Sequence, residues 1–99
     1  MRATLHPDAE QDIFEAAAFY EREGSAELAA RFIAEVKRVT SLVIQHPGLG
    51  TPRPGGRKFF PLRVFPYALI YRPLDDGIYI LVVRRHRRRP AFRTGRRSE

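Results

Sequence analysis

The carboxyl-terminal half of this 99-residue chain holds most of the side chains that could do chemistry on a phosphate group. Residues 1–50 contain 5 basic and 8 acidic side chains, a net charge of −3. Residues 51–99 contain 13 basic and 3 acidic side chains, a net charge of +10. All of the 18 cations except Lys37 and Lys58 are arginines, whose planar guanidinium groups grip phosphate or carboxylate at two points. This half predicts a polyanionic target or an acidic protein partner.

His86 lies within the densest run of these cations. Beside a bound phosphate, an imidazole could accept a proton or donate a hydrogen bond, and metal-free RNA cleavage needs such a group together with cations that stabilise the phosphorane. A histidine that ends a strand can equally well bond a local carbonyl group, so both interpretations stay open. We expect the following cations to lie on or near one sheet, where they could surround a phosphate: Lys58, Arg63, Arg72, Arg85 and Arg89.

Other kinds of site have little support in the sequence. Successive histidines are 40 residues apart, without the spacing of metal ligands, and the chain contains no cysteine. The glycines between Gly48 and Gly56 match neither a P-loop nor a dinucleotide-binding loop. Phe92, set among arginines, could stack on a base, whereas most other aromatic residues are expected in the core. Because the sequence has neither metal-ligand spacing nor a nucleotide-binding loop, we expect no metal and no cofactor.

Two helices are predicted ahead of the strands. Pro7 suits the first position of a helix, and the apolar spacing that follows predicts one buried face. Gly24 ends this helix, Ser25 caps the next one, and the break between them is short enough for an antiparallel hairpin. Phe14 and Phe19 fall off the buried stripe and are expected to form an exposed patch for a partner.

After a loop over residues 48–56, the apolar period changes to that of strands. We predict strands at 58–64, 65–71 and 78–85, with an edge strand at 2–6, and the last strand is apolar on both faces, which favours a central, covered position. The expected fold class is α+β, in the order β-α-α-β-β-β, with the antiparallel run completing one small sheet. We expect a single domain over 1–93 and a frayed basic tail over 94–99.

The hydropathy pattern favours a soluble, cytoplasmic protein. The longest apolar run has six residues, 78–83, too few to span a bilayer. The first residues lack the apolar segment of a signal peptide. Neither a membrane span nor a membrane partner is therefore expected.

Six short stretches follow one another along the chain in a recognisable order: 6–12, 18–21, 30–32, 46–50, 63–71 and 86–90. Each stretch is weakly specific by itself, but their order is quite specific. Together they resemble the RelE/ParE superfamily of toxins from bacterial type II toxin–antitoxin (plasmid stabilisation) systems. The superfamily's compact sheet beside a helical hairpin agrees with the predicted order of elements.

The resemblance implies one of two activities. RelE-like members are ribosome-dependent messenger ribonucleases that use strand lysines and arginines with a C-terminal tyrosine, whereas ParE-like members inhibit DNA gyrase by binding. Arg63 and Arg89 match family arginines, but Phe92 stands at the tyrosine-like position and has no proton to give. This favours the ParE-like branch and a toxin that is not an enzyme. The alternatives are a RelE-like ribonuclease that uses His86, Arg63, Arg85 and Arg89, and a non-toxic nucleic-acid- or protein-binding module with the same fold.

The resemblance also implies a small acidic antitoxin and a toxin–antitoxin hetero-oligomer. The basic half would attract an amphipathic acidic segment along the helices and the sheet. For this partner we expect contacts with Phe14, Phe19 and Arg72. The residues expected to bind the target or its phosphate groups are Lys58, Arg63, Arg85, His86, Arg89 and Phe92.

Overall fold

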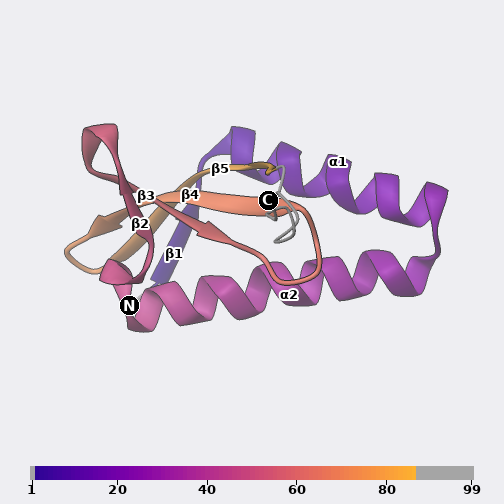
Figure 1. Cartoon of the computed structure of the whole chain (residues 1–99), viewed down its shortest axis with the longest axis horizontal. Helices are drawn as coiled ribbons and strands as arrows, with labels where there is room; N and C mark the ends of the chain where they lie inside the picture. The colour runs from indigo at the N-terminus through magenta and orange to yellow at the C-terminus, as the bar shows by residue number, and fades with distance from the viewer. Residues whose placement is uncertain (1, 87–99) are drawn as a thin grey trace, which may run out of the picture.

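The computed structural model describes residues 2–86, which form a helical hairpin and one five-stranded sheet (Figure 1). The strand order is β1-β5-β4-β3-β2, with β1 parallel to β5 and every other neighbouring pair antiparallel. The α+β class and the element order are confirmed, in a sheet that is mixed. The elements are β1 (Arg2–Leu5), α1 (Pro7–Glu23), α2 (Ala26–Gln45), β2 (Thr51–Arg53), β3 (Arg57–Pro61), β4 (Tyr67–Leu74) and β5 (Gly77–Arg85).

The helix boundaries follow from capping residues. The His6 side chain accepts a hydrogen bond from the Asp8 N–H at the start of α1, and the Ser25 hydroxyl accepts one from the Leu28 N–H at the start of α2. Gly24 joins the two helices, so they run antiparallel and project beyond the sheet (Figure 1). The predicted hairpin is confirmed, because the local signals that end one helix and cap the next act within a few residues.

The predicted strand limits after the hairpin need correction. The strand expected over 58–64 ends at Pro61, and the one expected over 65–71 begins at Tyr67 and runs to Leu74. Proline lacks the N–H that a ladder needs, so the chain leaves the sheet there and turns within residues 63–66. The predicted loop over 48–56 contains the short strand β2 between two 3₁₀ turns. The edge strand at the amino terminus is confirmed as β1.

The last strand, β5, is interior over only part of its length. Parallel pairing with β1 covers Gly77 to Ile80, where a Cβ on Gly77 would overlap the carbonyl oxygen of Arg2. Beyond Ile80, β5 is an edge strand, and the Asp12 carboxylate on α1 accepts its Val83 N–H at 3.0 Å. The expectation that both faces of β5 are covered is wrong, since the helices pack on one face only. A bulge beside Ile70 and Tyr71 shifts the register and places apolar side chains on both faces.

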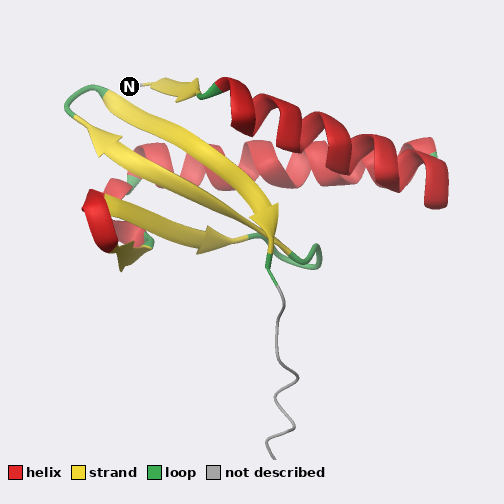
Figure 2. Ribbon diagram, turned by 90° about the horizontal axis from the view of Figure 1, so that it is seen from above, coloured by secondary structure: helices red, strands yellow, loops and turns green. Residues whose placement is uncertain are grey.

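The core lies between the hairpin and one face of the twisted sheet (Figure 2). At its outer end, Tyr20, Phe32, Phe65 and Tyr67 form an aromatic cluster with ring centroids 5.1–6.2 Å apart. At its inner end, the buried Tyr71 hydroxyl donates to the Pro47 carbonyl and accepts the Gly50 N–H, which ties the chain after α2 to β4. These contacts fix β4 against the hairpin and leave the opposite face of the sheet open. No helix within residues 2–86 has the length and apolar character needed to cross a membrane.

Candidate functional site

The face of the sheet that the helices leave uncovered carries one arginine on each of β2, β3, β4 and β5. Residues paired across neighbouring strands share a face, so Arg53 and Arg57 lie on the same side, as do Ile70 with Val82 and Ala68 with Arg84. Arg53, Arg57 and Arg84 line one hollow of about 140 Å³ above Ile70 and Val82. Arg72 follows Ile70 by two positions on β4 and therefore lies on this side too. We call Arg53, Arg57, Arg72 and Arg84 the arginine face.

Within residues 2–86, no carboxylate forms an ion pair with any of these four guanidinium groups. Arg57 donates to the Pro54 carbonyl at 3.0 Å and Arg72 to the Gly55 carbonyl at 3.1 Å, so backbone oxygens of the β2–β3 turn orient two of them. The Arg53 guanidinium stacks 4.4 Å from the centroid of the Phe59 ring. All four side chains are exposed and retain donors for an external anion.

His86 joins this face at the end of β5. Its ring makes an edge-to-face contact with Phe59 at 4.9 Å between centroids. The backbone N–H of His86 donates a hydrogen bond to the Pro66 carbonyl. The Phe59 ring therefore contacts both the Arg53 guanidinium and the His86 imidazole. The resulting surface combines fixed positive charge, an aromatic ring and an imidazole, which suits binding to phosphate or carboxylate groups.

The predicted single cluster of cations is wrong in its membership. Arg72 belongs to the arginine face, and His86 lies beside that face. Lys58 is half-buried opposite Tyr71 on the face toward the helices, and the Arg85 guanidinium lies 5.9 Å from the Tyr67 ring on that same side. Arg63 lies in the β3–β4 loop beside α2, and the predicted Arg89 and Phe92 fall outside the described residues.

Sequence reasoning missed Arg53, Arg57 and Arg84 as members of the site. The loop predicted over 48–56 includes Arg53, and of the two adjacent arginines Arg84 and Arg85 the sequence prediction names only Arg85. Successive residues of a strand point to opposite faces, so those two adjacent arginines cannot serve one surface. That alternation was the signal available in the sequence.

The two exposed phenylalanines of α1 do not form the single patch that was expected. They are five positions apart, which places them about 140° around the helix axis. Phe14 is 68% exposed, whereas Phe19 is 39% exposed and lines a hollow with Arg22, Tyr67 and Arg85. They therefore offer two separate apolar contacts on opposite flanks of the helix.

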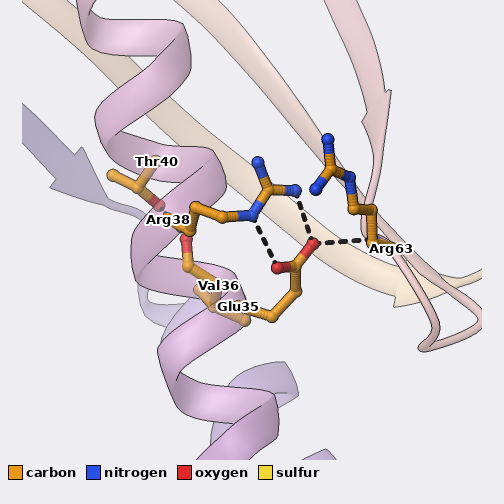
Figure 3. A network of polar contacts seen from close by, with 5 residues as sticks. All are labelled: Glu35, Val36, Arg38, Thr40 and Arg63. Atoms are coloured by element: carbon orange, nitrogen blue, oxygen red, sulfur yellow. Dashed lines mark hydrogen bonds and ion pairs between the residues drawn. The ribbon is translucent and has the colours of Figure 1, made fainter.

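A second charged site joins α2 to the β3–β4 loop (Figure 3). The Glu35 carboxylate accepts two hydrogen bonds from the Arg38 guanidinium, at 2.7 and 2.8 Å, and one from the Arg63 backbone N–H at 2.7 Å. The Arg63 guanidinium lies next to that of Arg38 in Figure 3, so a second positive group lies near the Arg38–Glu35 ion pair. The hydrogen bonds from Arg38, together with that from the Arg63 N–H, lower the pKa of Glu35 despite its partial burial.

This network predicts a dependence of stability on pH. Because the folded-state pKa of Glu35 is lowered, its stabilising effect is fully present above the ordinary glutamate value of about 4.3 and is lost as the pH falls through the folded pKa. Glu35→Gln keeps an acceptor for the Arg63 N–H but removes the charge. We expect it to lower the free energy of unfolding by about 0.5–1 kcal/mol at pH 7, an effect limited by the exposure of Arg38.

Urea unfolding between pH 7 and pH 2.5 measures this effect. The difference in the free energy of unfolding between wild type and Glu35→Gln should narrow as the pH falls below about 4. The exposed Glu21→Gln is the matched control and should show no gap at any pH. If this difference for Glu35→Gln stays constant down to the lowest pH, the loss of stability comes from packing instead of charge.

Within residues 2–86, no three His, Asp or Glu side chains are grouped closely enough to hold a metal ion. The helical hairpin, the mixed sheet and the arginine face together define a small α+β domain with one sheet face that the helices leave uncovered.

Comparison with known proteins gives a family. The family model for the ParE toxin of type II toxin-antitoxin system, parDE, matches residues 3–90. "Toxin ParE2" from Mycobacterium tuberculosis strains CDC 1551 / Oshkosh and ATCC 25618 / H37Rv is 31% identical over 83 residues, covering 84% of this chain and 79% of the relative. Because the family model spans most of the sequence, the chain belongs to the ParE toxin family of type II toxin–antitoxin systems.

A solved structure shows the same fold. The chain from "Chromosomal ParDE TA system from P. aeruginosa" superposes with a TM-score of 0.76 at 18% sequence identity, covering 88% of this chain and 97% of the other. At this identity the likeness concerns the fold alone. The family model and the relatives from Mycobacterium tuberculosis confirm, on its ParE-like side, the resemblance recognised from the short sequence stretches.

Proposed function

We propose that this ParE-type toxin inhibits DNA gyrase by binding to it through the arginine face. The observation that carries the proposal is the group of four exposed guanidiniums on the uncovered sheet face, all without an ion pair in residues 2–86. Backbone acceptors and the Phe59 ring hold three of them in place before any target binds, which lowers the entropy lost on binding. Such a surface suits a target that presents several carboxylates or phosphates together.

The proposed contact includes only some of the residues predicted to bind the target. Arg72 belongs to the arginine face and His86 lies beside it, so both are included in the proposed contact. Lys58, Arg63 and Arg85 lie off this face, so one rigid target surface would not reach all of them together with the arginine face. Arg89 and Phe92 stay in the proposal from the sequence alone.

We also propose that a small acidic antitoxin neutralises the toxin in a hetero-oligomer. Phe14 and Phe19 supply separate apolar contacts on α1, and Arg72 lies on the arginine face itself. An antitoxin that reached Arg72 would cover part of the surface proposed to bind the target. Neutralisation would then follow from direct competition for the same guanidinium groups. A toxin that acts on gyrase, and the antitoxin that neutralises it, would work in the cytoplasm.

A supercoiling assay with purified gyrase tests the proposed target. Toxin in stoichiometric excess should inhibit supercoiling, and addition of the antitoxin encoded beside the toxin gene should restore it. Raising the salt concentration should weaken the inhibition, because exposed charges are screened. Full gyrase activity at a large excess of toxin would refute gyrase as the target.

One observation favours ribonuclease activity as a second candidate function. His86 lies on the same face as Arg84 and contacts the Phe59 ring, on which the Arg53 guanidinium also stacks, so an imidazole and a guanidinium meet at one aromatic side chain. This arrangement could bind RNA and transfer a proton from its 2′-hydroxyl. In a translating extract, the RelE-like alternative predicts cleaved messenger RNA that His86→Ala abolishes, whereas intact messenger during toxin action rejects it.

A further inference from the structure

Strand pairing places three members of the arginine face in one row across the sheet. Arg53 is paired with Arg57 between β2 and β3. The β3–β4 ladder pairs Lys58 with Tyr71, and one step further along both strands Arg57 comes opposite Arg72. The Arg72 guanidinium also donates to a backbone carbonyl of the β2–β3 turn, which holds it on that side. Neighbouring strands are about 4.7–4.9 Å apart, so the backbone positions of these three arginines span about 10 Å.

The fourth arginine, Arg84, lines a hollow beside this row. The hollow has a volume of about 140 Å³ and is also lined by Arg53 and Arg57. Ile70 and Val82 form its apolar floor, so these two side chains offer the guanidiniums no acceptor. A water molecule occupies about 30 Å³ in the liquid, so the hollow has room for a phosphate group of five heavy atoms. Three guanidiniums around one such space suit a tetrahedral anion.

The four arginines lie on strands that carry no acidic side chain. Between residues 51 and 86 the acidic residues are Asp75 and Asp76, which form the turn between β4 and β5. Protein surfaces usually mix both signs of charge, so a protein partner seldom offers several carboxylates in a row without cations between them. Duplex DNA does offer such a row, with one phosphate charge per about 1.7 Å of helix axis. The arrangement therefore favours a nucleic-acid backbone over a protein surface as the anion.

We propose that the arginine face binds the phosphate backbone of duplex DNA, with one phosphate in the hollow between Arg53, Arg57 and Arg84. Arg72, at the end of the row, would contact a further phosphate. The inference rests on the proposed inhibition of gyrase, and it names the DNA on which gyrase acts as the surface that this face contacts. Phosphate contacts carry no sequence information, so binding should not depend on the base sequence.

The salt dependence of DNA binding by the toxin alone tests this inference. Fluorescence anisotropy with a short labelled duplex gives the binding constant between about 50 and 200 mM NaCl, and each phosphate contact adds about 0.9 to the slope of log K against log salt. Glutamine at Arg53, Arg57 and Arg84 together removes three charges and keeps polar side chains. We expect this variant to reduce the magnitude of the slope by about 2–3 and to bind the duplex at least about tenfold more weakly at the lowest salt concentration.

A matched variant with glutamine at Arg22, Arg31 and Lys37 has the same net charge and should keep the wild-type slope. Six arginines after His86 are common to all three proteins, so their attraction for DNA cancels in the comparison. Equal loss of slope in both triple variants would show that overall charge attracts DNA, and would overturn the site. Absence of binding by wild type would overturn it as well. Tighter binding of single-stranded RNA than of the duplex would overturn DNA as the ligand.

Gyrase assays separate this inference from the proposed function. Toxin should bind gyrase at least about tenfold more tightly when gyrase holds DNA, and the variant at Arg53, Arg57 and Arg84 should lose that difference. Inhibition of gyrase by wild type, with equal affinity for gyrase in the presence and absence of DNA, would overturn the inference and leave the proposed function intact. Binding of DNA through the arginine face without inhibition of gyrase would support the phosphate site and reject gyrase as the target.

Discussion

Under the proposed function, reversing the charge of Arg53, Arg57 and Arg84 together, by substitution with glutamate, is expected to abolish inhibition of gyrase while the protein stays folded. These three side chains line one hollow on the sheet face that the helices leave open. They are exposed and form no ion pair within residues 2–86, so the fold loses little when they change. An anionic target would meet three negative charges in place of three positive ones. Opposed like charges at an interface cost several kcal/mol, which corresponds to a loss of at least about a hundredfold in affinity.

The supercoiling assay measures the effect, and circular dichroism checks the fold. A matched control reverses three exposed cations of the helical hairpin, at Arg22, Arg31 and Lys37, and so produces the same net charge. We expect the control to inhibit gyrase at no more than a few times the wild-type concentration. Equal loss in both triple variants would show that overall charge, and not this face, attracts the target. Wild-type inhibition by the variant at Arg53, Arg57 and Arg84 would reject the face as the site of contact.

Replacing Phe32 with alanine will produce the largest loss of stability among single substitutions considered for this chain. Phe32 on α2 is 0% exposed and lies 5.4 Å, between ring centroids, from each of Tyr20, Phe65 and Tyr67. It therefore connects both helices to β4 and to the β3–β4 loop. Truncation removes apolar contacts and leaves a cavity, at a cost of about 3–5 kcal/mol. For a domain of this size, the melting temperature should fall by about 12 °C or more.

Chemical and thermal unfolding test this prediction. Phe14→Ala removes the same side chain from an exposed position on α1 and should change stability by less than about 0.5 kcal/mol. Phe32→Leu keeps most of the buried apolar volume, so its loss of stability should lie between those of Phe14→Ala and Phe32→Ala. A loss below about 1 kcal/mol for Phe32→Ala would mean that the aromatic cluster does not hold the hairpin against the sheet.

Local signals were sufficient for the helical hairpin. His6, Gly24 and Ser25 act on backbone groups within a few residues of themselves, so the limits of both helices could be read from neighbours in the sequence. The change from helical to alternating apolar period likewise placed β4 and β5 in the correct order. These features depend on the chain's own local geometry, which a sequence specifies directly.

The candidate site was less accessible, because it depends on which face each strand residue occupies. The bulge between Ile70 and Tyr71 changes the alternation along β5, and the pairing of β2 with β3 brings Arg53 to the sheet from a segment that looked like loop. Val64 likewise gave no local sign of its strained backbone, with a φ of 71°, since that strain arises where Phe65 enters the core and Glu35 holds the Arg63 N–H.

By itself, the sequence determined the element order, the family and the excess of positive charge in the second half of the chain. Only the tertiary structure decided that Arg53, Arg57, Arg72 and Arg84 share one face, while Arg63 and Arg85 lie elsewhere. Charge and periodicity are properties of composition and local spacing. Convergence of side chains is a property of strand pairing, which joins residues far apart in the chain and changes face with each single-residue shift in register.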